Sequence, residues 1–200
     1  MATSVLAHDS NNLRKWEYGN GLYQRALHRY LDRMGSLLDQ CGAQNVLDAG
    51  CGEGYVQRGM TARGYRGRWT GVDLSPGAVR FARDRAPHHE WRVEDLAKLR
   101  FESSTFDAVL CSQVLEHIPT PDRVRDELAR VTSRHLLVSV PFEPVFRGLC
   151  ALSIALGIGQ DPGHVNFWTG LAFRRFLRPV GRLLHWERTT AYQIALVEIT

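Results

Sequence analysis

The stretch VLDAGCGEGY, residues 46–55, decides the fold and raises the question of the ligand. Its apolar start predicts a short buried strand, and glycines follow at every second position, Gly50, Gly52 and Gly54. Glycine suits such a turn because a side chain would hold the backbone away from a bound ligand. The spacing G-x-G-x-G differs from the G-x-G-x-x-G of dinucleotide-binding folds, which presents a pyrophosphate to a helix N-terminus.

Acidic residues around this turn indicate a ligand that carries positive charge. Asp48 precedes the first glycine by two positions, which disfavours a pyrophosphate and favours a cation. Asp73 ends the next predicted strand, where a carboxylate accepts the hydroxyl protons of a ribose. Asp95 ends the third strand and is placed to receive an adenine amino group, with Leu96 packing on the ring. Glu94 stays an alternative to Asp95, because strand ends are uncertain by a residue or two.

The rest of the chain reads as alternating strands and helices. Ser75 and Thr120 are predicted helix caps, each followed by a proline at the first helical position. Strands separated by helices predict a mainly parallel, doubly wound α/β sheet. The predicted strands cover residues 45–50, 69–73, 90–96, 106–114 and 135–141, and further predicted helices cover 22–38 and 55–63.

The pattern changes after Pro141. Residues 142–178 form a long excursion, of the kind that usually holds substrate in compact α/β domains. Residues 182–200 read as two strands joined without a helix, which predicts an antiparallel pair at one edge of the sheet. We expect a single domain over 1–200, with an N-terminal helical cap at 13–40 and a substrate-side insertion at 142–178.

Composition is that of an ordinary globular protein, with 44% hydrophobic and 23% charged residues in a chain of 200. The four cysteines form no CxxC pair, which predicts reduced thiols and a cytoplasmic protein.

No secretory signal and no run of 18 apolar residues is found, so no transmembrane segment is expected. The apolar segment 149–159 is interpreted as a buried or lid helix, with contact to a membrane surface or a lipophilic substrate as the alternative. Scattered arginines carry the net charge of +4, so no nucleic-acid partner is expected.

Four segments together, VLDAGCGEGY, GVDLSPGAVRFAR, VEDL and FDAVLCSQVLEHIP, resemble the cofactor motifs of class I S-adenosylmethionine-dependent methyltransferases over about residues 45–140. The resemblance implies a Rossmann-like sheet of seven strands, mainly parallel with an antiparallel last strand. It implies S-adenosylmethionine as the cofactor and S-adenosylhomocysteine as the product. The residues it assigns to the cofactor are Asp48, Gly50, Cys51, Gly52 and Gly54 for the methionine part, Asp73 and Leu74 for the ribose, Asp95 and Leu96 for the adenine, and Ser112, Gln113 and His117 after the fourth strand. Cys51 is interpreted as a small residue that fills the turn.

Methyl transfer from a sulfonium is an in-line displacement that needs alignment and, for some acceptors, removal of a proton. Catechol-type members of the family place metal-binding acids after strand four, where this chain has LCSQVLEH, so we predict no metal. The Asn-Pro-Pro-Tyr type tetrapeptide of amino-methylating nucleic-acid enzymes is absent at Cys111–Val114, and Pro141 is not followed by the cysteine of pyrimidine C5 enzymes. A small, partly hydrophobic acceptor is therefore expected, with oxygen favoured and nitrogen or carbon left open.

Two histidines are candidate general bases, since imidazole titrates near neutral pH. His117 follows strand four, with ordering of the cofactor as its alternative role, and His164 lies in the turn DPGHVNFW, with a structural hydrogen bond as its alternative. Candidate substrate-contacting residues are Trp16, Tyr18, Tyr23, Phe142, Phe146, His164, Trp168 and Tyr192. Methylation of RNA or protein, and a non-catalytic cofactor-binding regulatory module, remain competing hypotheses. The expected oligomeric state is a monomer or a homodimer.

Overall fold

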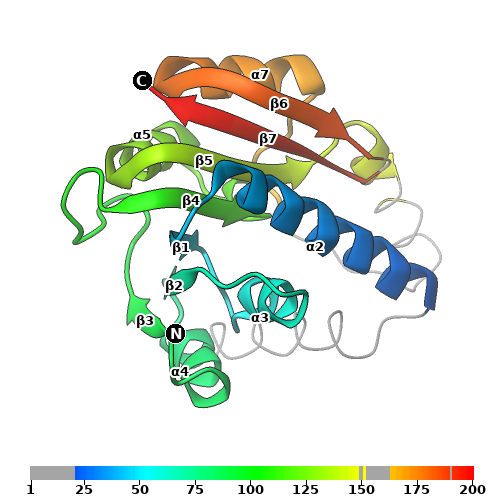
Figure 1. Cartoon of the computed structure of the whole chain (residues 1–200). Coiled ribbons are helices and arrows are strands. Elements are labelled where there is room, and N and C mark those ends of the chain that lie inside the picture. Colours follow the sequence, from blue (N-terminus) through cyan, green and yellow to red (C-terminus); the bar gives the residue numbers. More distant parts are fainter. Residues whose placement is uncertain (1–20, 149–150, 152–162, 190) are drawn as a thin grey trace, which may run out of the picture. The chain divides into compact units, whose positions relative to one another are not determined.

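The computed structural model describes residues 21–148, 151, 163–189 and 191–200. The chain divides into two compact units, residues 1–100 and 101–200. Strands of both units belong to a seven-stranded mixed sheet, and helices alternate with most of them (Figure 1). This confirms the predicted Rossmann-like α/β class.

The first unit is a parallel three-stranded arrangement with the order β3-β2-β1. Val46, Leu47 and Ala49 of β1 are fully buried, as expected for a parallel strand covered on both faces. The helix predicted over 22–38 is present, and it buries Leu31 and Met34 on one side. The elements of this unit are α2 (Gly21–Cys41), β1 (Asn45–Ala49), α3 (Tyr55–Ala62), β2 (Arg68–Asp73), α4 (Pro76–Arg85) and β3 (Glu90–Val93).

The second unit has the strand order β4-β5-β7-β6. β4 pairs with β5 in parallel, whereas β7 runs antiparallel to both β5 and β6. The last strand is therefore the reversed one, as predicted, and β6 occupies the edge with α7 packed along it (Figure 1). The elements are β4 (Phe106–Ser112), the 3-10 helix η1 (Leu115–His117), α5 (Pro121–Val131), β5 (Thr132–Pro141), α7 (Gly170–Leu177), the 3-10 helix η2 (Arg178–Val180), β6 (Gly181–Arg188) and β7 (Tyr192–Ile199).

The residues predicted to mark element ends were confirmed in part. Ser75 caps α4, because its hydroxyl accepts a hydrogen bond from the amide of Ala78 at 3.2 Å. Thr120 makes no side-chain cap for α5, although Pro121 opens that helix as predicted. The third strand ends at Val93, earlier than predicted, because the chain there enters a turn.

Some predictions fall on residues that lie outside the described part of the chain. These are Trp16, Tyr18, the first part of the helical cap at 13–40, and the apolar segment 149–159 apart from its residue 151. The side chain of Tyr23 is likewise outside the description, although its backbone belongs to α2. The single-domain organisation stays a prediction.

Candidate functional site

The glycine turn joins β1 to α3, at the place that the sequence predicts. Gly50, Gly52 and Gly54 have φ values of 80°, 51° and 74°, all in the left-handed region that disfavours residues with a Cβ atom. The amides of Gly50 and Cys51 donate to the carbonyl oxygen of Val72 at 2.8 and 2.9 Å. These two hydrogen bonds hold the turn against the end of β2.

Trp91 of β3 lies beneath this turn. A Cβ atom added to Gly54 would approach the Trp91 ring to 2.7 Å, and one added to Gly71 would approach it to 2.3 Å. The indole N–H donates to the carbonyl oxygen of Ala86 at 2.8 Å, so the ring has little freedom to move away. Cys51 is buried in the same apolar cluster as Trp91, as expected for a small residue that fills the turn.

Asp48 is the most unusual charged group of the turn. Its side chain is 1% exposed, and the carboxylate oxygen Oδ2 is buried without a hydrogen-bond partner among the described residues. Burial, together with the negative charge of Asp73, raises the pKa of Asp48 from 3.8 to about 7. Two neighbouring carboxylates, one of them buried and incompletely bonded, favour a cationic ligand at this turn.

Asp73 connects the turn to the end of β2. Its Oδ2 accepts the amide of Gly52 at 2.9 Å, and its Oδ1 accepts the amide of Ser75 at 2.9 Å. The half-buried carboxylate is thus held at a fixed position beside the glycine turn. Leu74, which follows it, is 72% exposed and offers an apolar surface at the strand end. The structure therefore brings the predicted methionine and ribose residues together.

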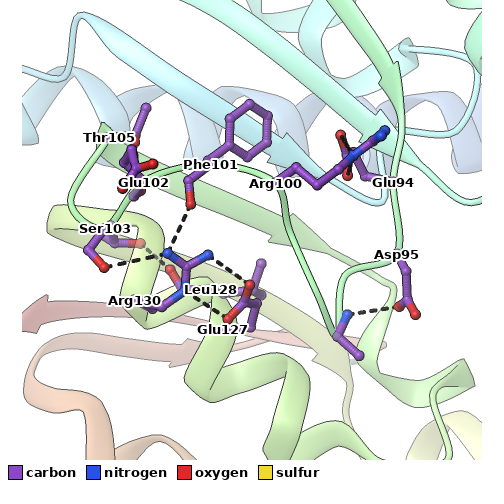
Figure 2. Close-up of polar contacts among 12 residues, drawn as sticks. Glu94, Asp95, Arg100, Phe101, Glu102, Ser103, Thr105, Glu127, Leu128 and Arg130 are labelled. Atoms are coloured by element: carbon purple, nitrogen blue, oxygen red, sulfur yellow. Dashed lines mark hydrogen bonds and ion pairs between the residues drawn. The ribbon is translucent and has the colours of Figure 1, made fainter.

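The two acids after β3 have different environments (Figure 2). Glu94 is 4% exposed and accepts hydrogen bonds at both carboxylate oxygens from Nε of Arg100, each at 3.0 Å. Asp95 is exposed, and its Oδ1 accepts the amide of Ala97 at 2.9 Å in the turn that ends the strand. Both carboxylate oxygens of Glu94 are already paired with Arg100. Asp95 is therefore the better candidate for binding the adenine amino group, and Leu96 is buried beside it.

The residues predicted after strand four belong to a second group of candidate site residues, which lies within residues 101–200. Ser112 ends β4, and Gln113 has a positive φ of 56°. The Gln113 amide donates to the carbonyl oxygen of Ser139 at 3.0 Å, and its side-chain amide donates to the Ser139 hydroxyl at 3.2 Å. The chain leaves β4 through this strained residue and enters η1, which carries His117.

The two predicted histidines lie next to each other although they are far apart in the sequence. The rings of His117 and His164 are 4.8 Å apart between centroids, in an edge-to-face arrangement. Phe146, a predicted substrate residue, stacks on the His164 ring at 5.0 Å with an interplanar angle of 17°. His117 Nδ1 lies 3.4 Å from the carbonyl oxygen of Gly163.

Glu116 is the site residue that the sequence analysis did not assign. It is 1% exposed, Oε2 has no hydrogen-bond partner within the described residues, and burial raises the pKa of this carboxyl from 4.5 to about 8. Glu116, His117 and His164 each offer one potential ligand atom, and these atoms all lie within 4.8 Å of one another. The signal was the Glu-His pair in VLEHIP, which the comparison with catechol-type enzymes led us to set aside.

The other predicted substrate residues in the described part of the chain lie in different surroundings. Trp168 is 8% exposed and packs against Phe173 and Phe176, which is the environment of a core residue. Phe142 lies under the Arg188 guanidinium, 4.7 Å from ring centroid to Cζ. Tyr192 is half-buried at the start of β7. Substrate contact by these residues stays a prediction.

Comparison with known proteins assigns the family. Residues 47–135 match the family model described as "Methyltransferase domain". The chain is 35% identical over 117 residues to a ubiquinone biosynthesis O-methyltransferase of Xanthomonas oryzae pv. oryzae, with 54% of this chain and 48% of the relative covered. These matches identify a class I S-adenosylmethionine-dependent methyltransferase domain within the chain. The predicted family and cofactor are thereby confirmed.

A second relative of this methyltransferase is the ubiquinone biosynthesis O-methyltransferase of Alkalilimnicola ehrlichii, 34% identical over 108 residues, with 50% of this chain and 42% of the relative covered. The chain spans about half the length of the curated relatives it matches. The relatives' acceptor therefore does not transfer to this chain with the family.

Solved structures agree on the fold of the methyltransferase. Magnesium protoporphyrin IX methyltransferase from Synechocystis PCC 6803 with bound S-adenosylhomocysteine superposes with a TM-score of 0.73 at 20% identity, covering 98% of this chain and 95% of that one. The [4+2]-cyclase SpnF superposes with a TM-score of 0.72 at 19% identity, covering 88% and 83%. A cyclase among these neighbours shows that the fold alone does not fix the reaction.

None of the helices in the described part of the chain combines the length and the apolar character needed to cross a membrane.

Proposed function

We propose that this methyltransferase transfers the methyl group of S-adenosylmethionine to a small, partly hydrophobic acceptor, at oxygen in preference to nitrogen or carbon. The observation that carries the proposal is the pairing of His117 and His164 beside the buried Glu116, at the end of β4. Groups of this type accept a proton from a hydroxyl near neutral pH. The likeness to ubiquinone biosynthesis O-methyltransferases supports oxygen as the methylated atom.

In this proposal the glycine turn and its acids bind the cofactor, and the histidine cluster acts on the acceptor. When bound, S-adenosylmethionine supplies an electrophilic methyl group on a positively charged sulfur. Asp48 balances the positive charge of the methionine part, the glycine turn allows close approach of the backbone, and Asp73 accepts the ribose hydroxyls. Asp95 accepts the adenine amino group, for which its exposed carboxylate is suited.

The histidine cluster handles the proton of the acceptor. As the oxygen–carbon bond forms and the carbon–sulfur bond breaks, sulfur keeps the electron pair and the hydroxyl proton must leave. His117 is exposed and half-buried His164 is stacked on Phe146, so both imidazoles are proposed to contact the acceptor. Phe146 adds an apolar face, which suits a partly hydrophobic acceptor.

The test is turnover of purified protein with S-adenosylmethionine and a panel of small hydroxylated aromatic compounds. We expect a methylated product by mass spectrometry together with S-adenosylhomocysteine, unchanged by nuclease treatment and without labelling of RNA or protein. Labelled RNA or protein would instead support the macromolecular alternative. Tight binding of S-adenosylhomocysteine with no turnover on any acceptor would support a regulatory module. The cytoplasmic location and the monomeric or homodimeric state stay predictions.

A further inference from the structure

Glu116, His117 and His164 form a three-membered cluster whose ligand atoms lie within 4.8 Å of one another. Two members come from η1, and the third comes from the segment that precedes α7. The two imidazoles meet edge to face, with their ring centroids 4.8 Å apart. The cluster therefore has the composition of a metal-binding site, with two nitrogen donors and one carboxylate.

The segment that carries His164 is fixed to η1 by main-chain hydrogen bonds. The amides of Val165 and Asn166 both donate to the carbonyl oxygen of Glu116, at 2.8 and 3.1 Å. The Asn166 side-chain amide donates to the carbonyl oxygens of Leu115 and Ile118, at 2.9 and 2.6 Å. These four hydrogen bonds hold His164 beside the other two residues, so the cluster is built into the packing of this unit.

Aromatic packing around His164 further restricts the orientation of its imidazole ring. Phe146 stacks on the imidazole, and the neighbouring Arg147 lies over the Phe167 ring at 4.7 Å from Cζ to centroid. The ring plane of His164 is thus set by a parallel aromatic neighbour. A side chain oriented before the ligand arrives loses little entropy on binding it.

The carboxylate of Glu116 needs a positively charged or donating partner. It is 1% exposed, its Oε2 makes no hydrogen bond, and no lysine or arginine forms an ion pair with it, across all the residues that the structure describes. An isolated buried carboxylate is costly, and it is stabilised by a metal ion or by a proton. With two imidazoles within reach, a metal ion satisfies all three side chains at once.

We propose that Glu116, His117 and His164 bind one divalent transition-metal ion, with Zn²⁺ as the preferred ion. Two nitrogen donors favour zinc over magnesium, which prefers oxygen ligands. Neighbouring ligand atoms of a tetrahedral zinc ion are about 3.4 Å apart, so the cluster has to contract by up to about 1.5 Å to bind. This replaces the expectation of a metal-free site that the sequence suggested.

Three protein ligands leave a coordination position open. A hydroxyl oxygen that binds there becomes more acidic, since zinc lowers the pKa of a bound hydroxyl group. This consequence rests on the proposed function, because it assigns the open position to the acceptor. With zinc bound, the two imidazoles act as ligands that make the acceptor hydroxyl more acidic, and its proton passes to solvent. Metal binding itself does not depend on that assignment.

The test is metal binding by the full chain after removal of metal with a chelator. We expect calorimetry with ZnCl₂ to give one ion per chain, and MgCl₂ in its place to give none. Substitution with Co²⁺ should give the visible absorption of a tetrahedral or five-coordinate nitrogen and oxygen site. Glu116→Gln and His164→Gln should each weaken zinc binding at least tenfold.

The matched control is His185→Gln, which removes the histidine of a surface pair with Glu187, 3.0 Å apart in the same unit. That variant should bind zinc like the unmodified chain, and S-adenosylhomocysteine binding by every variant shows that it has folded. Zinc affinity that is unchanged in Glu116→Gln and His164→Gln, or that falls only in His185→Gln, overturns the proposal. Zinc binding without turnover leaves this inference standing and removes the proposed function, and turnover by a chain that binds no zinc does the reverse.

Discussion

The glycine turn and the histidine cluster are built in different ways. The turn is specified within the continuous residues 48–54 and completed by Asp73, and its shape follows from three glycines with positive φ. The cluster joins His117 and His164, 47 positions apart in the sequence, and depends on Asn166 and main-chain hydrogen bonds for its alignment. The conformation of a short continuous stretch can be predicted from its sequence, whereas a contact with a segment distant in the sequence cannot.

This contrast predicts that substitutions in the turn change stability and cofactor affinity, and that substitutions in the cluster change turnover. The largest effect is expected for Gly54→Ala. The variant places a Cβ atom at a φ of 74° and 2.7 Å from the Trp91 ring, so both backbone strain and overpacking oppose folding. We expect a loss of about 4 kcal/mol in the free energy of unfolding by urea denaturation.

The control for Gly54→Ala is Gly42→Ala, at a φ of 64° with nothing within 4 Å of the added atom. It should lose only the strain contribution, about 1 kcal/mol. Equal losses in the two variants would show that Trp91 does not limit the turn.

The second effect concerns the cluster. We expect His164→Ala to lower turnover at saturating cofactor about a hundredfold, as for loss of a group that assists proton removal. The affinity for S-adenosylhomocysteine, measured by calorimetry, should stay the same because the variant does not alter the glycine turn. His185→Ala serves as the control and should turn over normally. A fall in cofactor affinity alongside the fall in turnover would contradict the assignment of cofactor binding to the glycine turn and of turnover to the histidine cluster.

The third effect tests the acid that completes the turn. Asp73→Ala removes the acceptor of two backbone amides, those of Gly52 and Ser75, along with the proposed ribose contact. We expect the binding free energy of S-adenosylhomocysteine to become less favourable by about 1.5 to 3 kcal/mol. Asp84→Ala, at an exposed position of α4, should leave affinity unchanged. An unaltered affinity in Asp73→Ala would refute the ribose role.

The smallest effect is the pH dependence of cofactor binding. Burial and Asp73 raise the pKa of Asp48 to about 7, and a cationic ligand binds the ionised form, so binding must displace a proton at lower pH. The affinity should therefore fall about tenfold for each pH unit below about 7 and level off above it. Asp48→Asn should bind more weakly and show no such slope. A flat profile in the unmodified chain would mean that Asp48 does not face the positive charge.

The same carboxyl affects stability without ligand, with the sign set by its raised pKa. The unfolded chain loses the Asp48 proton near pH 4, while the folded chain keeps it up to about pH 7. The contribution of this group to stability is therefore greatest at low pH and decreases as the pH rises through that window. Denaturation of Asp48→Asn, followed over the same range, should lack this decrease.

Much of the first unit was predictable because its signals are local. The positions of the glycine turn and of the Ser75 cap follow from residue types within a few positions of one another. The antiparallel pairing of β6 with β7 was predicted from the absence of a helix between them, and the reversed last strand from the resemblance to the family. The early end of β3 was missed because it depends on the turn that Asp95 makes with Ala97.

The candidate acceptor site was predictable only in part. His117 and His164 were chosen singly from their positions, and Phe146 from its aromatic ring, without a reason for them to meet. Glu116 was passed over, because in a sequence a carboxylate shows neither that it is buried nor that a hydrogen bond is missing. Burial and pairing are properties of the packed chain.

The sequence by itself determined the family and the cofactor, since glycines and acids at fixed spacing impose a turn through backbone sterics and charge. Only the tertiary structure decided that His164 and Phe146 lie beside Glu116 and His117. That choice required a distant segment to hydrogen-bond to η1, and such contacts come from the global packing of the unit rather than from any local preference.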